Sequence, residues 1–110
     1  MRTLQLRQLI KTALEDAKAH DIVTLDVRKV SDFTDYMIVV TGTSNRHVVS
    51  VADKVLDRLN EHKRRPVGVE GMEGGEWVLL DFGDVVVHVM RGATREFYQI
   101  EKLWSEGKRL

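Results

Sequence analysis

The turn Thr41-Gly42-Thr43-Ser44 is the most enzyme-like element of this sequence. It follows an apolar run and precedes a segment in which apolar residues recur at helical spacing. A Gly-Ser turn at the N-terminus of a helix can present backbone N–H groups to a phosphate. Ser44, Arg46 and His47, at the start of the predicted helix, are therefore candidates for contact with an anion.

Phosphoryl transfer at such a turn would also need carboxylates. Nucleotidyltransferases hold their metal ion with a close pair, spaced Asp-x-Asp, on one face of a neighbouring strand. This chain has no such pair, because Asp81 and Asp84 straddle a predicted turn and Asp26 is a single acid. Ser44 is more simply the N-cap of a helix. A small nucleotide-binding or nucleotidyltransferase enzyme that uses Thr41–Ser44 is the alternative function.

Two other signals do not amount to catalytic or metal motifs. Asp81-Phe82-Gly83 matches a triplet of protein kinases, but the chain has no glycine-rich loop and is too short for that fold. The four histidines form neither a His-x-His nor a His-x-x-x-His pair. We therefore predict no catalytic residue, no metal site and no cofactor.

The segment Glu76–Met90 predicts a β-hairpin whose two faces differ. Its β-branched and aromatic runs are typical of strands, and Phe82-Gly83 suits a two-residue loop. With that loop the opposing pairs are Asp81–Asp84, Leu79–Val86 and Trp77–His88. Side chains alternate between faces, so one face is aliphatic and carries Val78, Leu80, Val85, Val87 and Val89. The other face, called the mixed face below, carries Trp77, Leu79, Asp81, Asp84, Val86, His88 and Met90.

The mixed face is the best candidate for a binding surface. The aliphatic face already supplies a core, and Trp and Met are enriched where a partner removes a surface from water. Packing of Trp77 beneath a loop or against a helix is the alternative interpretation. His88, which the predicted register places opposite Trp77, is interpreted as a polar contact on this face rather than as a metal ligand.

The remaining segments show helix patterns at three places. One helix is predicted over Thr3–Ala19, with Thr3 as its N-cap, and a second runs from Ser44 to the basic run at 62–65, where Pro66 stops it. The basic run complements the helix dipole, and a phosphate-contacting patch is the alternative. A last helix, capped by Thr94, is predicted to turn inward Phe97, Ile100, Leu103 and Trp104. Residues 105–110 are predicted to fray.

Strand patterns fill the intervals between these helices. Strands are predicted at 21–27, 36–40 and 67–70, besides the hairpin. The run at 36–40 is continuously apolar, which is typical of a strand buried on both faces. Together the elements predict a single α/β domain over residues 1–110, with a mixed sheet of about five strands flanked by helices.

Length and composition limit the class of protein. The chain has 110 residues, no cysteine, and seventeen basic residues that balance seventeen acidic ones. A net charge of zero argues against broad electrostatic capture of RNA or DNA but leaves room for a local basic patch. No apolar run approaches the roughly 20 residues that cross a bilayer, and the N-terminus does not have the pattern of a secretory signal. We expect a soluble cytoplasmic domain with no membrane partner.

Five motifs occur in order along the chain: Asp21-Ile22-x-x-Leu25-Asp26-Val27, Thr34-Asp35-Tyr36, Thr41-Gly42-Thr43-Ser44-x-Arg46-His47-Val48, Val69-Glu70-Gly71 and the hairpin run from Trp77 to Val89. Together they resemble the ribosomal silencing factor family, also called Iojap-like proteins. The resemblance extends from about Leu6 to Trp104. Motifs of this length and order are far more specific than a three-residue signature.

The resemblance implies a fold and a function. It implies a nucleotidyltransferase-like fold without transferase activity, in agreement with the missing carboxylate pair. It implies binding to the large ribosomal subunit through ribosomal protein fourteen, obstruction of small-subunit joining and reduced translation when nutrients are scarce. It also implies a homodimer when the protein is free, for which the Trp77 face is one candidate surface.

The resemblance also assigns residues to these contacts. The hairpin face would meet the ribosomal protein through Trp77, Leu79, Asp81, His88 and Met90. Ser44, Arg46 and His47 remain candidates for a minor contact with ribosomal RNA.

Overall fold

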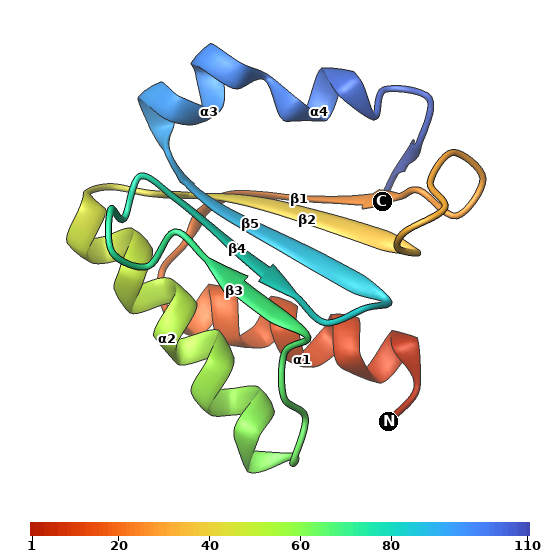
Figure 1. Ribbon diagram of the computed structural model, residues 1–110, viewed down its shortest axis with the longest axis horizontal. Helices are drawn as coiled ribbons and strands as arrows, with labels where there is room; N and C mark the ends of the chain where they lie inside the picture. The colour runs from red at the N-terminus through yellow and green to blue at the C-terminus, as the bar shows by residue number, and fades with distance from the viewer.

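One mixed sheet organises this protein, and helices cover both of its faces (Figure 1). The computed structural model describes residues 1–110. In chain order the elements are α1 (Thr3–Asp16), β1 (His20–Asp26), β2 (Tyr36–Gly42), α2 (Asn45–Glu61), β3 (Gly68–Glu70), β4 (Trp77–Asp81), β5 (Val85–Arg91), α3 (Gly92–Tyr98), α4 (Ile100–Leu103) and β6 (Lys108–Arg109). The strands form one six-stranded sheet in the order β3-β4-β5-β2-β1-β6. The α/β class and the mixed sheet are confirmed, with one strand more than the sequence predicted.

The central strands β2 and β5 are the only parallel neighbours in the sheet. They run side by side from the pair Tyr36–Val85 to the pair Gly42–Arg91. A parallel pair needs a long crossover, which α2, β3 and β4 supply. Five successive residues of β2, from Tyr36 to Val40, are buried. The continuous apolar run thus correctly predicted a strand covered on both faces.

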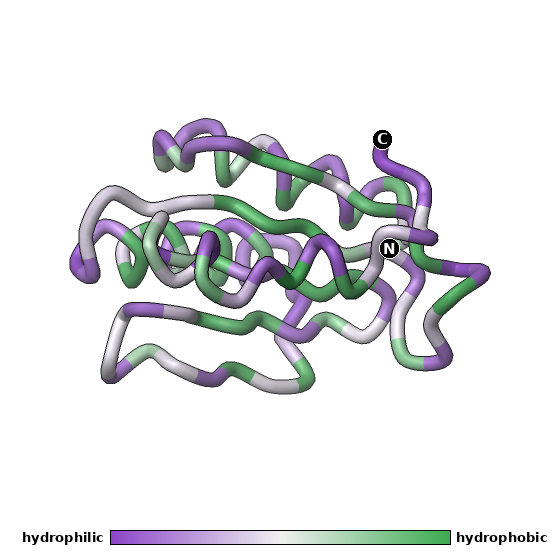
Figure 2. The backbone as a smooth tube through the Cα atoms, turned by 90° about the horizontal axis from the view of Figure 1, so that it is seen from above, coloured by the Kyte–Doolittle hydropathy of each residue, from purple (hydrophilic) through white to green (hydrophobic).

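Each face of the sheet has its own hydrophobic core. Helices α1 and α2 cover the aliphatic face, where Leu6, Ile10, Val51 and Leu59 pack against the inward valines of the hairpin. Helices α3 and α4 lie on the opposite face (Figure 1). The smaller core beneath them contains Val23, Leu25, Val27, Met37, Val39, Met90 and Ile100. In Figure 2 hydrophobic stretches run along the strands, whereas hydrophilic and hydrophobic residues alternate along the helices.

The register of the hairpin differs from the prediction by two residues. Trp77 pairs with Met90 rather than with His88, and Leu79 pairs with His88. The predicted pairs were wrong because the strands are joined by a turn over residues 82–85, closed by a bond from the Phe82 N–H to the Val85 carbonyl oxygen (2.9 Å). A shift of two residues keeps every paired side chain on its predicted face. The mixed and aliphatic faces of the two strands are therefore confirmed.

Asp84 is the exception, because it lies in the turn and not on the mixed face. Gly83 adopts a positive φ of 86° there, which favours glycine. The Thr3 hydroxyl donates to Asp84 Oδ2 (2.8 Å), so the turn is fastened to the start of α1. Thr3 was predicted as the N-cap of that helix, but Arg2 occupies the cap position and the Thr3 side chain is used in this tertiary contact. None of the helices is both long and apolar enough to cross a membrane.

The C-terminal segment differs most from the prediction. Gln99 takes a left-handed conformation (φ 45°, ψ 49°) and divides the expected single helix into α3 and α4. Phe97 and Leu103 were expected inside but are 73% and 76% exposed, whereas Ile100 is buried. Residues 108–109 do not fray, because they form β6 beside β1.

Candidate functional site

Strand β4 presents Trp77, Leu79 and Asp81 on the mixed face, at the margin of the cover formed by α3 and α4. All three side chains are partly exposed. Of these only Trp77 packs against the smaller core. Strand β3, beyond β4, has no neighbour on its other side. The mixed face is thus a covered core near the centre of the sheet and an open surface near β3 and β4.

Trp77 is the centre of an aromatic row that leads from the sheet to the surface. Its indole Nε1–H donates to His88 Nδ1 (3.0 Å). Its ring lies 5.1 Å, between centroids, from the ring of Tyr98 on α3, and Tyr98 in turn meets Phe97 edge-on at 4.9 Å. Tyr98 is 55% exposed and Phe97 is 73% exposed. We call His88, Trp77, Tyr98 and Phe97 the aromatic row.

His88 fixes the orientation of Trp77 by accepting the hydrogen bond from its indole N–H. Only 7% of His88 is exposed, and burial lowers its pKa to about 4. An indole N–H can only donate, so the bond requires that Nδ1 carry no proton. The imidazole is therefore neutral at physiological pH and holds the indole in one orientation. The predicted polar contact between the two side chains is confirmed, whereas a direct contact of His88 with a partner is restricted by its burial.

Met90 is fully buried in the smaller core. Across the strands it pairs with Trp77, and Ile100 of α4 belongs to the same cluster. In this conformation its side chain has no surface to offer a partner, which corrects the expectation that it lies on an open face. The C-terminal helices provide the cover that the hairpin pattern alone did not indicate.

Tyr98 is a surface residue that the sequence did not identify. The expected helix over this segment assigned its inward positions to other residues, including Phe97. Left-handed Gln99 ends α3 directly after Tyr98, and this places the Tyr98 ring against Trp77. Two aromatic residues side by side before a polar residue were the only local signal.

The turn at Thr41–Ser44 uses its polar groups within the fold. Ser44 Oγ accepts from the His47 backbone N–H (3.0 Å), which confirms Ser44 as the N-cap of α2. The Thr43 backbone N–H donates to His47 Nδ1 (2.9 Å), and His47 Nε2 lies 3.0 Å from the Ala17 carbonyl oxygen. Because Nδ1 accepts, Nε2 carries the proton and donates to Ala17. Of the three predicted anion contacts, only Arg46 has an exposed side chain that makes neither a hydrogen bond nor an ion pair within the protein.

The acids that were weighed as metal ligands are also engaged elsewhere. Asp26 accepts two bonds from the Arg28 guanidinium, at 2.9 and 2.7 Å. These side-chain bonds are the main reason that the pKa of Asp26 falls to about 2. Asp81 Oδ1 accepts from the Gly83 N–H (2.8 Å) and shapes the hairpin turn. No group of three or more His, Asp or Glu side chains is arranged to hold a metal ion.

Comparison with known proteins gives consistent matches over the whole chain. A family model described as "Ribosomal silencing factor during starvation" matches residues 1–110. A ribosomal silencing factor from Chromobacterium violaceum is 48% identical over 108 residues, which cover 98% of this chain and 88% of that protein. A crystal structure of a protein from Chromobacterium violaceum, 48% identical, has a TM-score of 0.93 and covers 96% of this chain and 88% of that chain.

A more distant relative comes from mouse. The protein named "Mitochondrial assembly of ribosomal large subunit protein 1" is 33% identical over 100 residues, which cover 88% of this chain and 44% of the mouse protein.

Proposed function

This chain belongs to the ribosomal silencing factor family, and on that premise we propose that it binds the large ribosomal subunit and sterically blocks joining of the small subunit. Its contact on the large subunit is ribosomal protein fourteen, and the result is repression of translation when nutrients are limiting. The words "silencing" and "starvation" in the family description support the repression. The name of the mouse relative supports the choice of the large subunit.

The observation that carries the docking surface is the aromatic row at the open margin of the mixed face. Trp77 is held by His88 on one side and by Tyr98 on the other. A side chain that is already fixed in its bound orientation loses little conformational entropy on binding. Large aromatic side chains also dominate the free energy of protein interfaces. Leu79 and Asp81, which are partly exposed beside Trp77, complete the surface.

The proposed mechanism is occlusion and needs no catalytic residue. The molecule measures 34 × 34 × 21 Å, so a copy bound on the intersubunit face is a bulky obstacle. A standard interface buries about 1,600 Å² in total, or roughly 800 Å² on each partner. That is about one-eighth of the 6734 Å² surface of this protein. We propose that the margin of the mixed face and α3 together supply this contact.

The free protein is proposed to form a homodimer through the same aromatic row. The exposed rings of Tyr98 and Phe97 lie next to each other on α3, and apolar rings on a surface are favourable to cover. If the two contacts share this row, dimer and ribosome complex exclude each other. Sedimentation over a concentration series, with wild type and Trp77→Ala, tests the dimer: a mass that never exceeds that of one chain refutes it.

Nucleotide chemistry is the alternative function, and no contact in the turn favours it. A phosphate at the Thr41–Ser44 turn would have to compete with His47 for the Thr43 N–H. Equilibrium dialysis with a labelled nucleotide and Mg²⁺ is the direct test. Saturable binding that is lost in Ser44→Ala would favour the enzyme over the occlusion mechanism.

The docking proposal is tested by co-sedimentation with purified large subunits. Trp77→Ala is expected to weaken binding about 30-fold or more, as the loss of a hot-spot residue does, and to restore joining of the subunits in a sucrose-gradient assay. Leu4→Ala is the matched control, because Leu4 is 64% exposed on α1, on the opposite face of the sheet. A folded Trp77→Ala protein that binds as tightly as the control contradicts the role of the aromatic row.

A further inference from the structure

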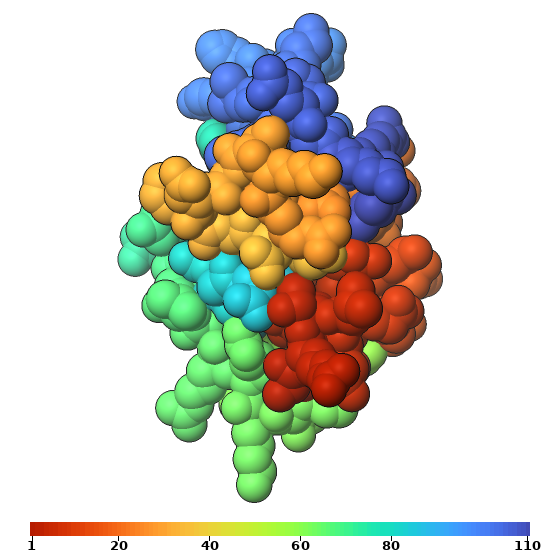
Figure 3. Space-filling view, turned by 90° about the vertical axis from the view of Figure 1, so that its right-hand side faces the viewer, coloured from red at the N-terminus to blue at the C-terminus, as the bar shows by residue number.

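Three segments that are distant in the sequence meet at one end of the molecule (Figure 3). They are the first turns of α1, the loop 27–35 between β1 and β2, and the C-terminal segment that contains β6. In Figure 3 these segments appear red, orange and dark blue and share a single face. The proposed docking surface does not use any of them.

An exposed aromatic ring projects from the loop on this face. Phe33 is 87% exposed, more than any other large hydrophobic residue of the chain. The loop that carries it is well ordered by hydrogen bonds: the Val27 N–H donates to the Asp35 carbonyl oxygen (2.9 Å), the Ser31 N–H donates to the Val27 carbonyl oxygen (2.8 Å), and the Phe33 N–H donates to Ser31 Oγ (3.0 Å). These hydrogen bonds fix the backbone of the loop in a conformation that leaves the Phe33 side chain exposed to solvent, so its ring is available to a partner. A single exposed ring is common on protein surfaces, so its surroundings decide its meaning.

Cations surround the base of this loop. Arg7 of α1 and Arg28 of the loop both lie over the ring of Tyr36, at 4.6 and 5.4 Å from its centroid. Arg28, Lys29 and Lys108 line one hollow of about 640 Å³, while Arg7 and Lys11 line a second hollow together with Thr24 and Leu110. Lys108 of β6 lies opposite Asp26 of β1 in the backbone register of the sheet. Segments from three parts of the chain thus bring their positive charges together.

Most of these charges are not neutralised within the protein. The only ion pair among these cations is Arg28–Asp26, so Arg7, Lys11, Lys29 and Lys108 have no carboxylate partner. The acids near them are Asp26, Asp32, Asp35 and Glu106, and both Asp26 and Glu106 line the same hollow as Lys108. The five cations named here outnumber these four acids, so this end of the molecule has a small local excess of positive charge although the whole chain has a net charge of zero.

We propose that this end of the molecule is an RNA-binding surface for single-stranded or looped RNA. Lys29, Lys108 and Arg28 contact backbone phosphates, and an unpaired base stacks on the ring of Phe33. Base stacking on exposed aromatic rings beside a positively charged groove is the general way in which proteins bind unpaired nucleotides. An acidic protein would satisfy the cations but would leave the aromatic ring without a partner of matching chemistry. The RNA surface does not depend on the docking role of Trp77.

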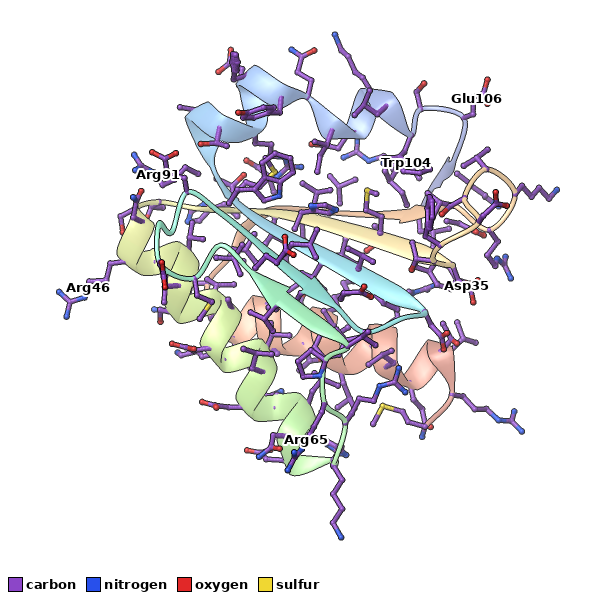
Figure 4. All side chains as sticks on the ribbon, in the orientation of Figure 1. Asp35, Arg46, Arg65, Arg91, Trp104 and Glu106 are labelled. Carbon is purple, nitrogen blue, oxygen red and sulfur yellow. The ribbon has the colours of Figure 1, made fainter.

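The aromatic row and the loop lie at opposite ends of the central strands, whereas Asp81 of the docking surface pairs with Val86 at the same end as the loop. Figure 4 shows Arg91 at one end of the sheet and Asp35 of the loop at the other. Arg91 marks the end near Trp77, because Trp77 pairs with Met90, the residue before Arg91. RNA bound at the loop therefore leaves the aromatic row open. Both contacts can be made by one copy of the chain at the same time.

Fluorescence anisotropy with a labelled single-stranded oligouridylate tests this proposal at low salt. Wild type is expected to bind saturably, with an affinity that falls steeply as salt is added. Phe33→Ala is expected to weaken binding about 5-fold or more, because one base loses its stacking partner. The double variant Lys29→Ala/Lys108→Ala is expected to lower the slope of log affinity against log salt by about 1.4, since each lost phosphate contact lowers it by about 0.7. Asp32→Asn, which removes an opposing charge, is expected to tighten binding.

Matched controls decide whether the binding is local. Phe97→Ala removes a ring that is 73% exposed on α3, and Lys54→Ala removes an exposed cation on α2; both are expected to bind RNA as wild type does. The proposal is overturned if wild type shows no saturable binding, if the control variants lose as much affinity as the loop variants, or if an oligoglutamate peptide binds better than the RNA. Circular dichroism of each variant establishes that it is folded before its affinity is compared.

Discussion

Titration of His88 gives the sharpest test of how the aromatic row is supported. The folded protein keeps this imidazole neutral, because burial lowers its pKa from 6.5 to about 4. Protonation would place an N–H at Nδ1 against the Trp77 N–H, 3.0 Å away, and two donors would then face each other. The unfolded chain takes up a proton at His88 below about pH 6.5, whereas the folded chain does so only near pH 4. The contribution of His88 to the stability of the fold should therefore fall as the pH is lowered through this window and become level below it.

The size of this effect follows from the two pKa values. Each unit of pKa difference corresponds to about 1.4 kcal/mol. Between about pH 7.5 and about pH 4.5 most of the difference is expressed, so His88 alone should lower the free energy of unfolding by about 2.5 kcal/mol. This is a large fraction of the free energy of unfolding of a typical domain, which is roughly 5–15 kcal/mol. The carboxyl of Asp26, with its pKa of about 2, titrates below the window.

Urea unfolding at a series of pH values, with wild type and His88→Gln, isolates this contribution. Glutamine does not titrate, and its side-chain oxygen can still accept from the Trp77 indole. Every other group is common to both proteins, so the difference between their pH profiles reports on His88. Wild type should lose about 2.5 kcal/mol more than the variant over this range. Profiles that run parallel from about pH 7.5 to about pH 4.5 would show that His88 titrates normally, and the reasoning from burial would be refuted.

Two further predictions concern the residues that fix the frame. Gly42→Ala should lower the free energy of unfolding, measured with urea, by about 1–3 kcal/mol. Its new Cβ would lie 2.6 Å from Val48 Cγ2 and 3.0 Å from the Val48 backbone. Gly68→Ala is the control, because a Cβ there meets nothing within 4 Å, and it should differ little from wild type in the same experiment. Arg95→Ala should cost about 2–3 kcal/mol, because its guanidinium, in a side chain only 12% exposed, binds both carboxylate oxygens of Glu101 and also the Thr41 hydroxyl. Arg46→Ala, which removes an unpaired arginine, is the control, and equal stability of the two arginine variants would contradict this role of Arg95.

The sequence predicted the two faces of the hairpin correctly although it predicted the pairing incorrectly. The face on which a side chain lies depends only on whether its residue number is odd or even along the strand. The turn over 82–85 shifts the cross-strand pairing by two residues, an even number, so the faces are unchanged. Ser44 was predictable for a similar reason, because an N-cap is a local contact that reaches the His47 N–H three residues later. Features that depend on neighbouring residues alone were therefore accessible from the sequence.

The features that were missed depend on contacts between distant segments. Lys108 and Arg109 form a strand only because the backbone of β1 is available beside them, and their side chains carry no strand signal. Gln99 breaks the last helix in a conformation that is uncommon for glutamine, and this exposes Phe97 and Leu103. The burial of Met90 follows from the same break, since it is α4 that brings Ile100 over the sheet.

Helix α3 owes its position to its ends rather than to a buried face. None of its residues is buried, so hydrophobic burial contributes little to holding it on the sheet. Arg95 joins it to the backbone carbonyl of Asp21 and to Glu101, and Tyr98 rests on Trp77. A helix held by a few polar bonds and one ring contact keeps its aromatic side chains in water while fixing their direction. That arrangement suits a docking surface better than a core does, because the rings of the row are oriented before a partner arrives, and those of Tyr98 and Phe97 still have more than half of their area left to bury.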